Sequence, residues 1–122
     1  MALRDKMRES AQPFLAPGET LTQVIGAQTA SQYVAAFAGI FVFLGLNRYR
    51  ILAVTSQRIL VLDAGPASMK KAKSVVTELP RATRLGPANG VWHVLPVANE
   101  KLRIHRRFFK DIEAADAVLS GR

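Results

Sequence analysis

Two apolar runs joined by a short polar connection constrain the fold of this chain more than any other feature. RYRILAVT (residues 48–55) and RILVLDAG (58–65) are rich in β-branched and large aliphatic residues, and only Ser56 and Gln57 separate them. Such a pattern predicts two strands in succession. Their apolar residues fall on both faces, which is typical of strands that are covered on both sides.

Further β-rich runs lie on either side of this pair. TLTQVIGAQ (20–28) predicts a strand in which Gly26 marks a bulge or a crossing point. KSVVTELP (73–80) predicts another, and RATRL (81–85) is a candidate for one more. After the turn-forming GPANG, VWHVLPV and KLRIHRR predict a hairpin with its connection at residues 98–100.

A helix is expected near each end of the chain. The first covers residues 3–12, where apolar residues recur every four positions, and Pro13 ends it because proline lacks a backbone N–H. The second covers residues 108–119 and places four apolar residues on one stripe: Phe108, Ile112, Ala115 and Leu119.

The segment Tyr33–Leu46, YVAAFAGIFVFLGL, has no polar side chain except the tyrosine hydroxyl. As a helix it would be about 21 Å long at ~1.5 Å per residue, whereas the apolar core of a bilayer is about 30 Å thick. Extension back to Ala27 would supply the missing length. Three interpretations stay open: a membrane span, a buried core element, or an exposed element that contacts lipid or a second copy of the chain.

The charge balance favours an anionic partner. The chain has 17 Lys and Arg against 9 Asp and Glu, a formal net charge of +8. Such an excess attracts phospholipid, nucleic acid or an acidic protein. The residues that we expect to contact a membrane or partner are Phe37, Phe41, Phe43, Arg48, Arg50, Lys70, Lys71 and Lys73. A secondary basic patch is expected at Arg103, His105, Arg106 and Arg107.

No pattern in the sequence predicts catalysis. The chain has no cysteine, and its two histidines lack the ligand spacing that a metal site needs. Ser74, His93 and Asp63 could in principle form a triad, but no Gly-x-Ser-x-Gly elbow accompanies them. GPANG lacks the Gly-Lys-Ser/Thr of a phosphate-binding loop. We therefore expect no enzyme activity, cofactor, metal or small-molecule substrate.

The segment YRILAVTSQRILVLD (49–63) resembles bacterial members of the pleckstrin-homology-like (PH/GRAM-like) group. In that group a strand ends in Val-Thr, a few polar residues with Arg follow, and a second apolar strand comes next; here Val54, Thr55 and Arg58 occupy those places. The resemblance implies about seven antiparallel strands in two packed sheets, with a C-terminal helix at one open end. It also implies a binding module. The lysine-rich loop that binds phosphoinositides in many eukaryotic members has no counterpart here, because the apolar segment follows the first strand.

These observations predict a single domain over residues 1–122, since that length suits one domain. It would comprise an N-terminal helix in 1–13 and a mostly β, PH-like core in 20–119 that includes the apolar segment 33–46. The expected function is non-enzymatic association with an anionic membrane surface or a membrane protein. The alternatives are a nucleic-acid-binding domain and a homo-oligomeric scaffold. No secretory signal is expected in MALRDKMRES, so the expected location is the cytoplasm, peripheral at the inner face of the plasma membrane.

Overall fold

The computed structural model describes residues 2–30, 39, 42, 46–66, 68–97 and 100–120. Its described part is mostly β. The elements, in chain order, are α1 (Leu3–Ala11), η1 (Gln12–Phe14), β1 (Leu21–Gln28), β2 (Tyr49–Thr55), β3 (Arg58–Gly65), β4 (Ser74–Pro80), β5 (Trp92–Val97), β6 (Glu100–His105), η2 (Arg106–Phe108) and α4 (Phe109–Ser120).

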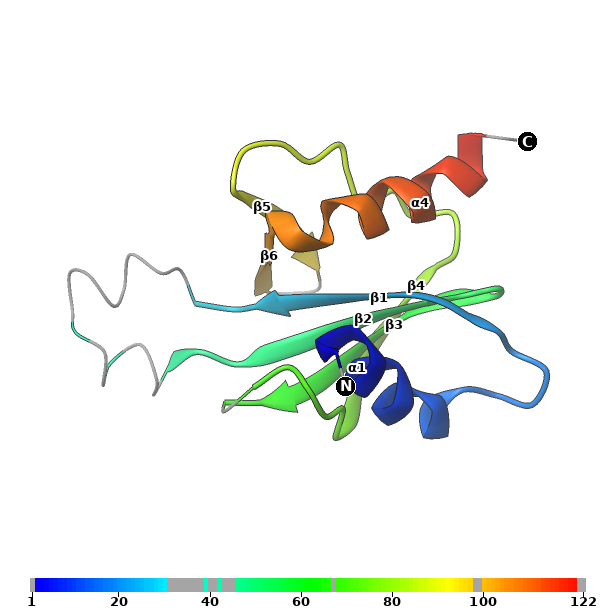
Figure 1. Cartoon of the computed structure of the whole chain (residues 1–122), viewed down its shortest axis with the longest axis horizontal. Helices are drawn as coiled ribbons and strands as arrows, with labels where there is room; N and C mark the ends of the chain where they lie inside the picture. Colours follow the sequence, from blue (N-terminus) through cyan, green and yellow to red (C-terminus); the bar gives the residue numbers. More distant parts are fainter. Residues whose placement is uncertain are drawn as a thin grey trace.

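All six described strands form one antiparallel sheet in the order β4-β3-β2-β1-β6-β5. Figure 1 shows β5 and β6 turned steeply away from the other strands, so the sheet curls into a half-barrel, with α4 and α1 on either side of β1. The prediction of a mostly β domain with a closing helix is confirmed. The described residues give six strands in one continuous sheet, where about seven strands in two sheets were expected.

The strands β2 and β3 confirm the prediction of two strands that are covered on both sides. Every residue of β2 from Ile51 to Thr55 is buried, as is every residue of β3 from Ile59 to Leu62. Thr55 closes the connection between them, because its hydroxyl oxygen accepts hydrogen bonds from the backbone N–H groups of Gln57 and Arg58 at 3.1 and 3.0 Å. The Val-Thr-x-x-Arg pattern is therefore, at least in part, the requirement of a tight turn.

The same turn carries an ion pair whose carboxylate is buried. The carboxylate of Glu19, whose side chain is fully buried, accepts hydrogen bonds from the Nε and Nη2 atoms of Arg58 at 3.0 and 3.1 Å. It also accepts from the Thr55 hydroxyl at 2.5 Å and from the backbone N–H of Ala16 at 2.9 Å. The Arg58 hydrogen bonds are the main reason that the pKa of Glu19 falls to about 2. This network ties the chain before β1 to the β2–β3 turn.

The expected strand at residues 81–85 is wrong, and the reason lies in α4. The backbone N–H groups of Leu85 and Gly86 each donate to the Asp116 carboxylate at 2.9 Å. The guanidinium of Arg81 donates to the carbonyl of Ala115 at 3.2 Å. Helix α4 thus satisfies the two backbone N–H groups, which in a strand would have donated to a neighbouring strand.

Packing at Gly26 confirms the expected crossing point. A Cβ atom at Gly26 would lie 3.0 Å from the ring of Phe108 and would collide with the sulfur of Met69. The irregularity in the register of β1 lies elsewhere, between Leu21 and Gln23. Phe108 and Ile112 are buried as the helical stripe predicts, whereas Leu119 is only half-buried. Gly26 therefore lets η2 and the segment after β3 pack directly on β1.

The N-terminal helix is confirmed over Leu3–Ala11, and its Met7 and Ala11 are buried. Arg8 fixes it to the sheet by donating hydrogen bonds to the carbonyls of Leu21 and Thr22 at 3.0 Å each. Most of the apolar segment 33–46, including Phe37, Phe41 and Phe43, lies outside the described residues. Among the helices that the structure describes, none is long and apolar enough to cross a membrane.

We predict that Glu19→Gln lowers the free energy of unfolding by about 2 kcal/mol at neutral pH, because a buried partner of Arg58 and Thr55 loses its charge. The Glu19 pKa is depressed from 4.5 to about 2, so its stabilisation is complete above pH 4.5 and is lost as the pH falls toward 2. When unfolding by urea is measured across this pH range, the free energy of unfolding should fall less steeply with decreasing pH in the variant than in the wild type. Equal slopes in both proteins would contradict the assigned role of Glu19.

Candidate functional site

At one end of the sheet, four paired residues lie in a row, and each belongs to a different strand. Tyr49 pairs with Gly65 on β3 and with Gln28 on β1, and Gln28 pairs in turn with Arg103 on β6. The segment that follows Gly65 carries Lys70, and the one that follows β6 carries Arg107. Arg103 itself lies in this row, so both groups of predicted basic residues lie near this end of the sheet.

The apolar segment begins and ends at this end of the sheet, where hydrogen bonds join residues 29 and 30 to residues 47 and 48. We call these four residues the neck. The backbone N–H of Thr29 donates to the carbonyl of Arg48, and the backbone N–H of Arg48 donates to the Thr29 hydroxyl, both at 2.9 Å. The amide oxygen of the buried Asn47 accepts from the backbone N–H of Ala30 at 3.1 Å. These bonds hold residues 30 and 47 together. Of the described residues between them, Leu46 is 62% exposed and Val42 is 44% exposed.

Arg50 differs in its surroundings from the other predicted contact residues. Its guanidinium contacts Asp63 at 2.6 Å and Glu100 at 3.0 Å, and its side chain is only 12% exposed. These carboxylates neutralise the charge of Arg50 and join β2, β3 and β6. We therefore assign Arg50 a structural role and leave it out of the candidate surface.

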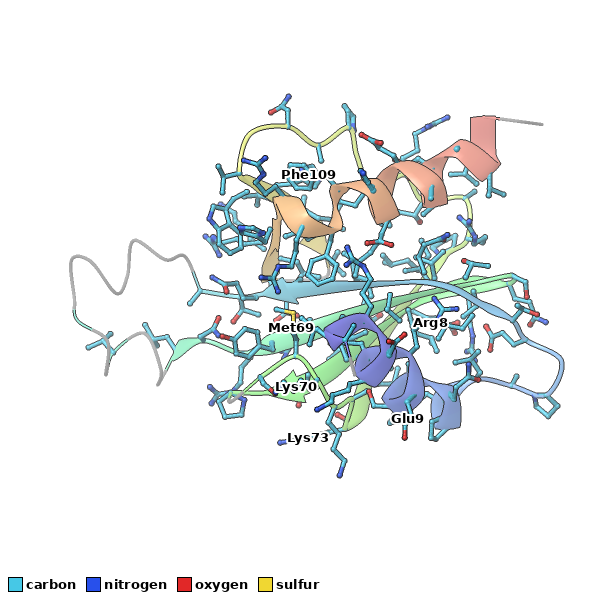
Figure 2. All side chains as sticks on the ribbon, viewed as in Figure 1. Arg8, Glu9, Met69, Lys70, Lys73 and Phe109 are labelled. Atoms are coloured by element: carbon cyan, nitrogen blue, oxygen red, sulfur yellow. The ribbon has the colours of Figure 1, made fainter. Side chains whose placement is uncertain are left out.

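Lys70, Lys71 and Lys73 lie exposed on the segment between β3 and β4. Figure 2 shows Lys70 and Lys73 on the side of the molecule where α1 lies. The backbone N–H of Ala72 donates to the Ser10 hydroxyl at 2.9 Å, which fixes this segment against α1. No carboxylate within the described ranges forms an ion pair with these lysines, so their charges are available to a partner.

The secondary basic patch is built on β6 and η2. The Nη1 atom of Arg103 donates to the carbonyl of Thr29 at 2.5 Å, which ties this arginine to the neck. The His105 ring meets Trp92 edge to face at 5.1 Å between centroids, and its Nδ1 atom accepts from the backbone N–H of Arg107 at 3.1 Å. Arg106 and Arg107 are exposed. Burial is the main cause that lowers the pKa of His105, and Arg107 and Arg106 add to it.

Two adjoining cavities connect the lysine segment with the patch. The first, the Lys70 cavity, has a volume of about 230 Å³ and is lined by Leu3, Tyr49, Ser68, Met69, Lys70 and Arg107. The second, the Trp92 cavity, has a volume of about 190 Å³ and is lined by Gly26, Gln28, Tyr49, Met69, Trp92, Arg103, His105, Arg107 and Phe108. Tyr49, Met69 and Arg107 line both. We call the surface formed by Arg48, Lys70, Lys71, Lys73, Arg103 and Arg107 the basic end.

Sequence analysis missed the aromatic part of this site. Trp92 lies opposite His105 in the β5–β6 ladder, and Tyr49 lies opposite Gln28 in the β1–β2 ladder. The first pairing follows from the predicted hairpin once its connection is set at residues 98–99, so the register could have revealed it. No pattern in the sequence around Met69 or Gly26 indicates that these two residues pack together.

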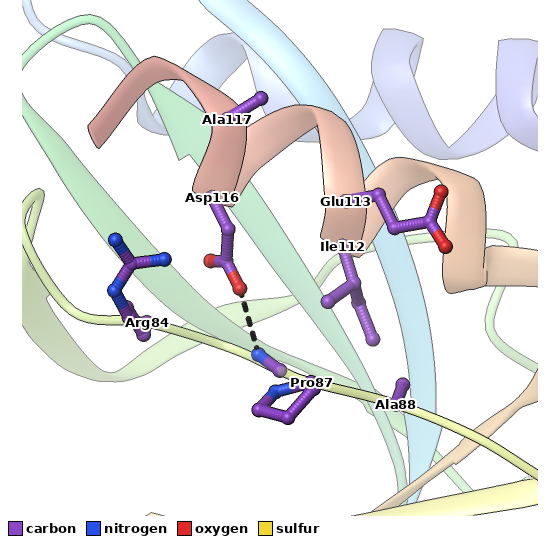
Figure 3. Close-up of a pocket in the computed structure, with 8 residues that line it drawn as sticks. Arg84, Pro87, Ala88, Ile112, Glu113, Asp116 and Ala117 are labelled. Atoms are coloured by element: carbon purple, nitrogen blue, oxygen red, sulfur yellow. Dashed lines mark hydrogen bonds between the residues drawn. The ribbon is translucent and has the colours of Figure 1, made fainter. Parts of the chain in front are cut away.

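A larger cavity elsewhere has a structural explanation. It has a volume of about 630 Å³ and lies between α4 and residues 84–88 (Figure 3). Its polar lining includes the Asp116 carboxylate, whose oxygens are engaged by the backbone of Leu85 and Gly86. Since Asp116 anchors the 81–91 segment to α4, we do not take this cavity as the functional site.

No family model, curated protein or solved structure matches the chain. Within the ranges that the structure describes, no three His, Asp or Glu side chains gather in a way that could hold a metal ion. We take the basic end with its two cavities as the candidate site.

We predict that protonation of His105 destabilises the fold. Its pKa lies below the ordinary 6.5, so the unfolded chain binds the proton first and stability falls as the pH drops below 6.5. His105→Asn keeps an acceptor for the Arg107 N–H but does not titrate. Chemical unfolding at about pH 7 and about pH 5 should show that the free energy of unfolding decreases less in the variant than in the wild type. An equal loss would contradict the assigned surroundings of His105.

Proposed function

We propose that this chain is a non-enzymatic binding module that attaches to an anionic membrane surface through its basic end. The observation that carries the proposal is the meeting of two groups of basic residues, far apart in sequence: Lys70 and Arg107 line one cavity, and Arg103 and Arg107 line the adjoining one. The exposed Leu46 comes shortly before Tyr49, which belongs to the row of paired residues at the same end of the sheet.

The distribution of ion pairs supports this assignment. Among the described residues, Arg4, Arg50 and Arg58 are paired with carboxylates. Within the part of the chain that the structure describes, no such pair involves Lys70, Lys71, Lys73, Arg103 or Arg107. Each basic residue near an anionic bilayer contributes about 1 kcal/mol of attraction, so several together hold a protein weakly.

Stable attachment generally needs a second, apolar anchor. Leu46 and Val42 are exposed apolar side chains of the segment whose two ends meet at the neck. We propose that this segment supplies the anchor, and Phe37, Phe41 and Phe43 remain its predicted contact residues. The positive charges of Arg48 and the lysine segment would then face the lipid headgroups.

The order of elements supports a PH-like architecture as part of the proposal. A four-stranded antiparallel meander, β1 to β4, precedes a further hairpin and a closing helix. The expected order was strand after strand with tight turns, then one amphipathic helix. The single curled sheet would make this domain a variant of that architecture, with a location at the inner face of the plasma membrane.

The first test compares sedimentation with phosphatidylserine-containing vesicles and with neutral phosphatidylcholine vesicles. We predict retention by the anionic vesicles alone, and release by added salt because the attraction is screened. Lys70→Gln should weaken binding about fivefold, which corresponds to the loss of about 1 kcal/mol. Val118→Glu is the matched control: it changes the net charge equally at an exposed site on α4 and should leave binding nearly unchanged.

If both variants lose affinity equally, net charge alone drives the association and the basic end has no special role. If the wild-type protein stays in the supernatant but shifts a nucleic acid probe, the alternative partner is correct. A concentration-dependent increase in mass without any vesicle binding would favour the homo-oligomeric scaffold instead.

A second test addresses the apolar anchor. Leu46→Ser should weaken vesicle binding at least about tenfold, since insertion of a leucine side chain is worth about 1.5–3 kcal/mol. The residue is 62% exposed, so we expect the melting temperature to stay within the range of other surface variants. Unchanged vesicle binding in a folded Leu46→Ser protein would show that this part of the segment does not enter the membrane.

A further inference from the structure

The Trp92 cavity combines an aromatic wall with positive charge. Tyr49, Trp92, His105 and Phe108 supply rings, Arg103 and Arg107 supply guanidinium groups, and no carboxylate is among its lining residues. Apolar walls with a few convergent polar groups are typical of small-molecule sites. The membrane proposal uses the cations that line this cavity, whereas a flat bilayer would not need its aromatic wall.

The rings favour a flat ligand. Trp92 and His105 stand edge to face at an interplanar angle of 82° and form one corner of the cavity. Planar groups pack against such aromatic surfaces by offset or edge contacts. The indole Nε1 of Trp92 is also buried without an acceptor among the described residues, which leaves an unmet hydrogen-bond donor beside the cavity.

The guanidinium groups favour an anion. Nη1 of Arg103 already donates to the carbonyl of Thr29, and this bond fixes the group while most of its five N–H donors stay available. Neither Arg103 nor Arg107 forms an ion pair with a carboxylate of the described residues. Guanidinium groups bind carboxylates and phosphates in two-point contacts.

The volume limits the ligand to a small molecule. A cavity of about 190 Å³ corresponds to roughly six water molecules at about 30 Å³ each. This is below the range of about 300–1,000 Å³ for drug-sized ligands, and it suits one ring with one acidic group.

We propose that the Trp92 cavity is a binding site for a small planar organic anion, a monocyclic carboxylate or phosphate, with its ring against Trp92 and Tyr49 and its acidic group on Arg103 and Arg107. This site would be distinct from the membrane-binding surface in its ligand. It would share Arg103 and Arg107 with the basic end, and Tyr49, Met69 and Arg107 line both cavities.

The experiment uses the fluorescence of Trp92, the only tryptophan of the chain. The full-length protein is titrated with benzoate and phenyl phosphate, without any membrane. Benzyl alcohol, which has the ring without the charge, and acetate, which has the charge without the ring, are the comparison probes. We expect a saturable change with at least one of the aromatic anions and at least tenfold weaker binding of both comparison probes.

Two variants locate the acidic group. Arg107→Gln and Arg103→Gln should each weaken binding of the aromatic anion about tenfold. Arg106→Gln is the matched control, because Arg106 is an exposed neighbour that lines neither cavity, and it should bind like the wild type. Arg107 is exposed and its described bonds involve its backbone, so its variant tests the proposal even if Arg103→Gln fails to fold.

The proposal is overturned if folded wild-type protein shows no saturable change up to about 10 mM of either aromatic anion, a concentration that would detect millimolar binding. It is also overturned if benzyl alcohol or acetate binds as tightly as the aromatic anions. Equal behaviour of Arg107→Gln and Arg106→Gln would have the same consequence. Because no vesicle is present, failure here leaves the membrane proposal standing, and failure of vesicle binding leaves this one standing.

Discussion

The arrangement of this molecule depends on the pairing of β1 with strands on both of its edges. Its β2 partner belongs to the four-stranded meander, and its β6 partner belongs to the hairpin that precedes α4. At Gln28 both pairings meet, with Tyr49 on one side and Arg103 on the other. Gly26, two residues earlier on β1, lets Met69 and Phe108 pack closely above the strand. The two halves of the sheet thus share one end, and everything proposed for function lies there.

The arginines of β2 and β3 have other surroundings than the basic residues at this end. Arg50 and Arg58 are held by Asp63, Glu100 and Glu19. The carboxylate of Glu19 is buried, which makes its pair with Arg58 sensitive to the loss of either partner. At the basic end, the lysines and Arg103 and Arg107 have no carboxylate partner among the described residues. A protein that used its charge only for solubility would not need to gather it around aromatic cavities.

The sequence predicted the local elements well and the site only in part. The buried strands 49–55 and 58–65 were predictable because their apolar residues and the connecting Thr55 act locally. The strand expected at 81–85 failed because Asp116, about thirty residues later, takes the backbone donors of Leu85 and Gly86. Both basic groups were visible in the sequence, but their meeting was not, since it depends on the pairing of Gln28 with Arg103. The partners of Arg50 were also not visible in the sequence, since Asp63 faces it across the β2–β3 ladder and Glu100 lies on a distant strand.

The most direct measurement of the central claim is an NMR titration of the backbone amides with nanodiscs that contain phosphatidylserine. If the basic end is one surface, the signals of residues 70–73 and of residues 103–107 should change together, at the same lipid concentration. The amide signals of residues 84–88 and of the second half of α4, which line the cavity of about 630 Å³, should not shift. Changes confined to one basic group, or centred on α4 and residues 84–88, would contradict the account.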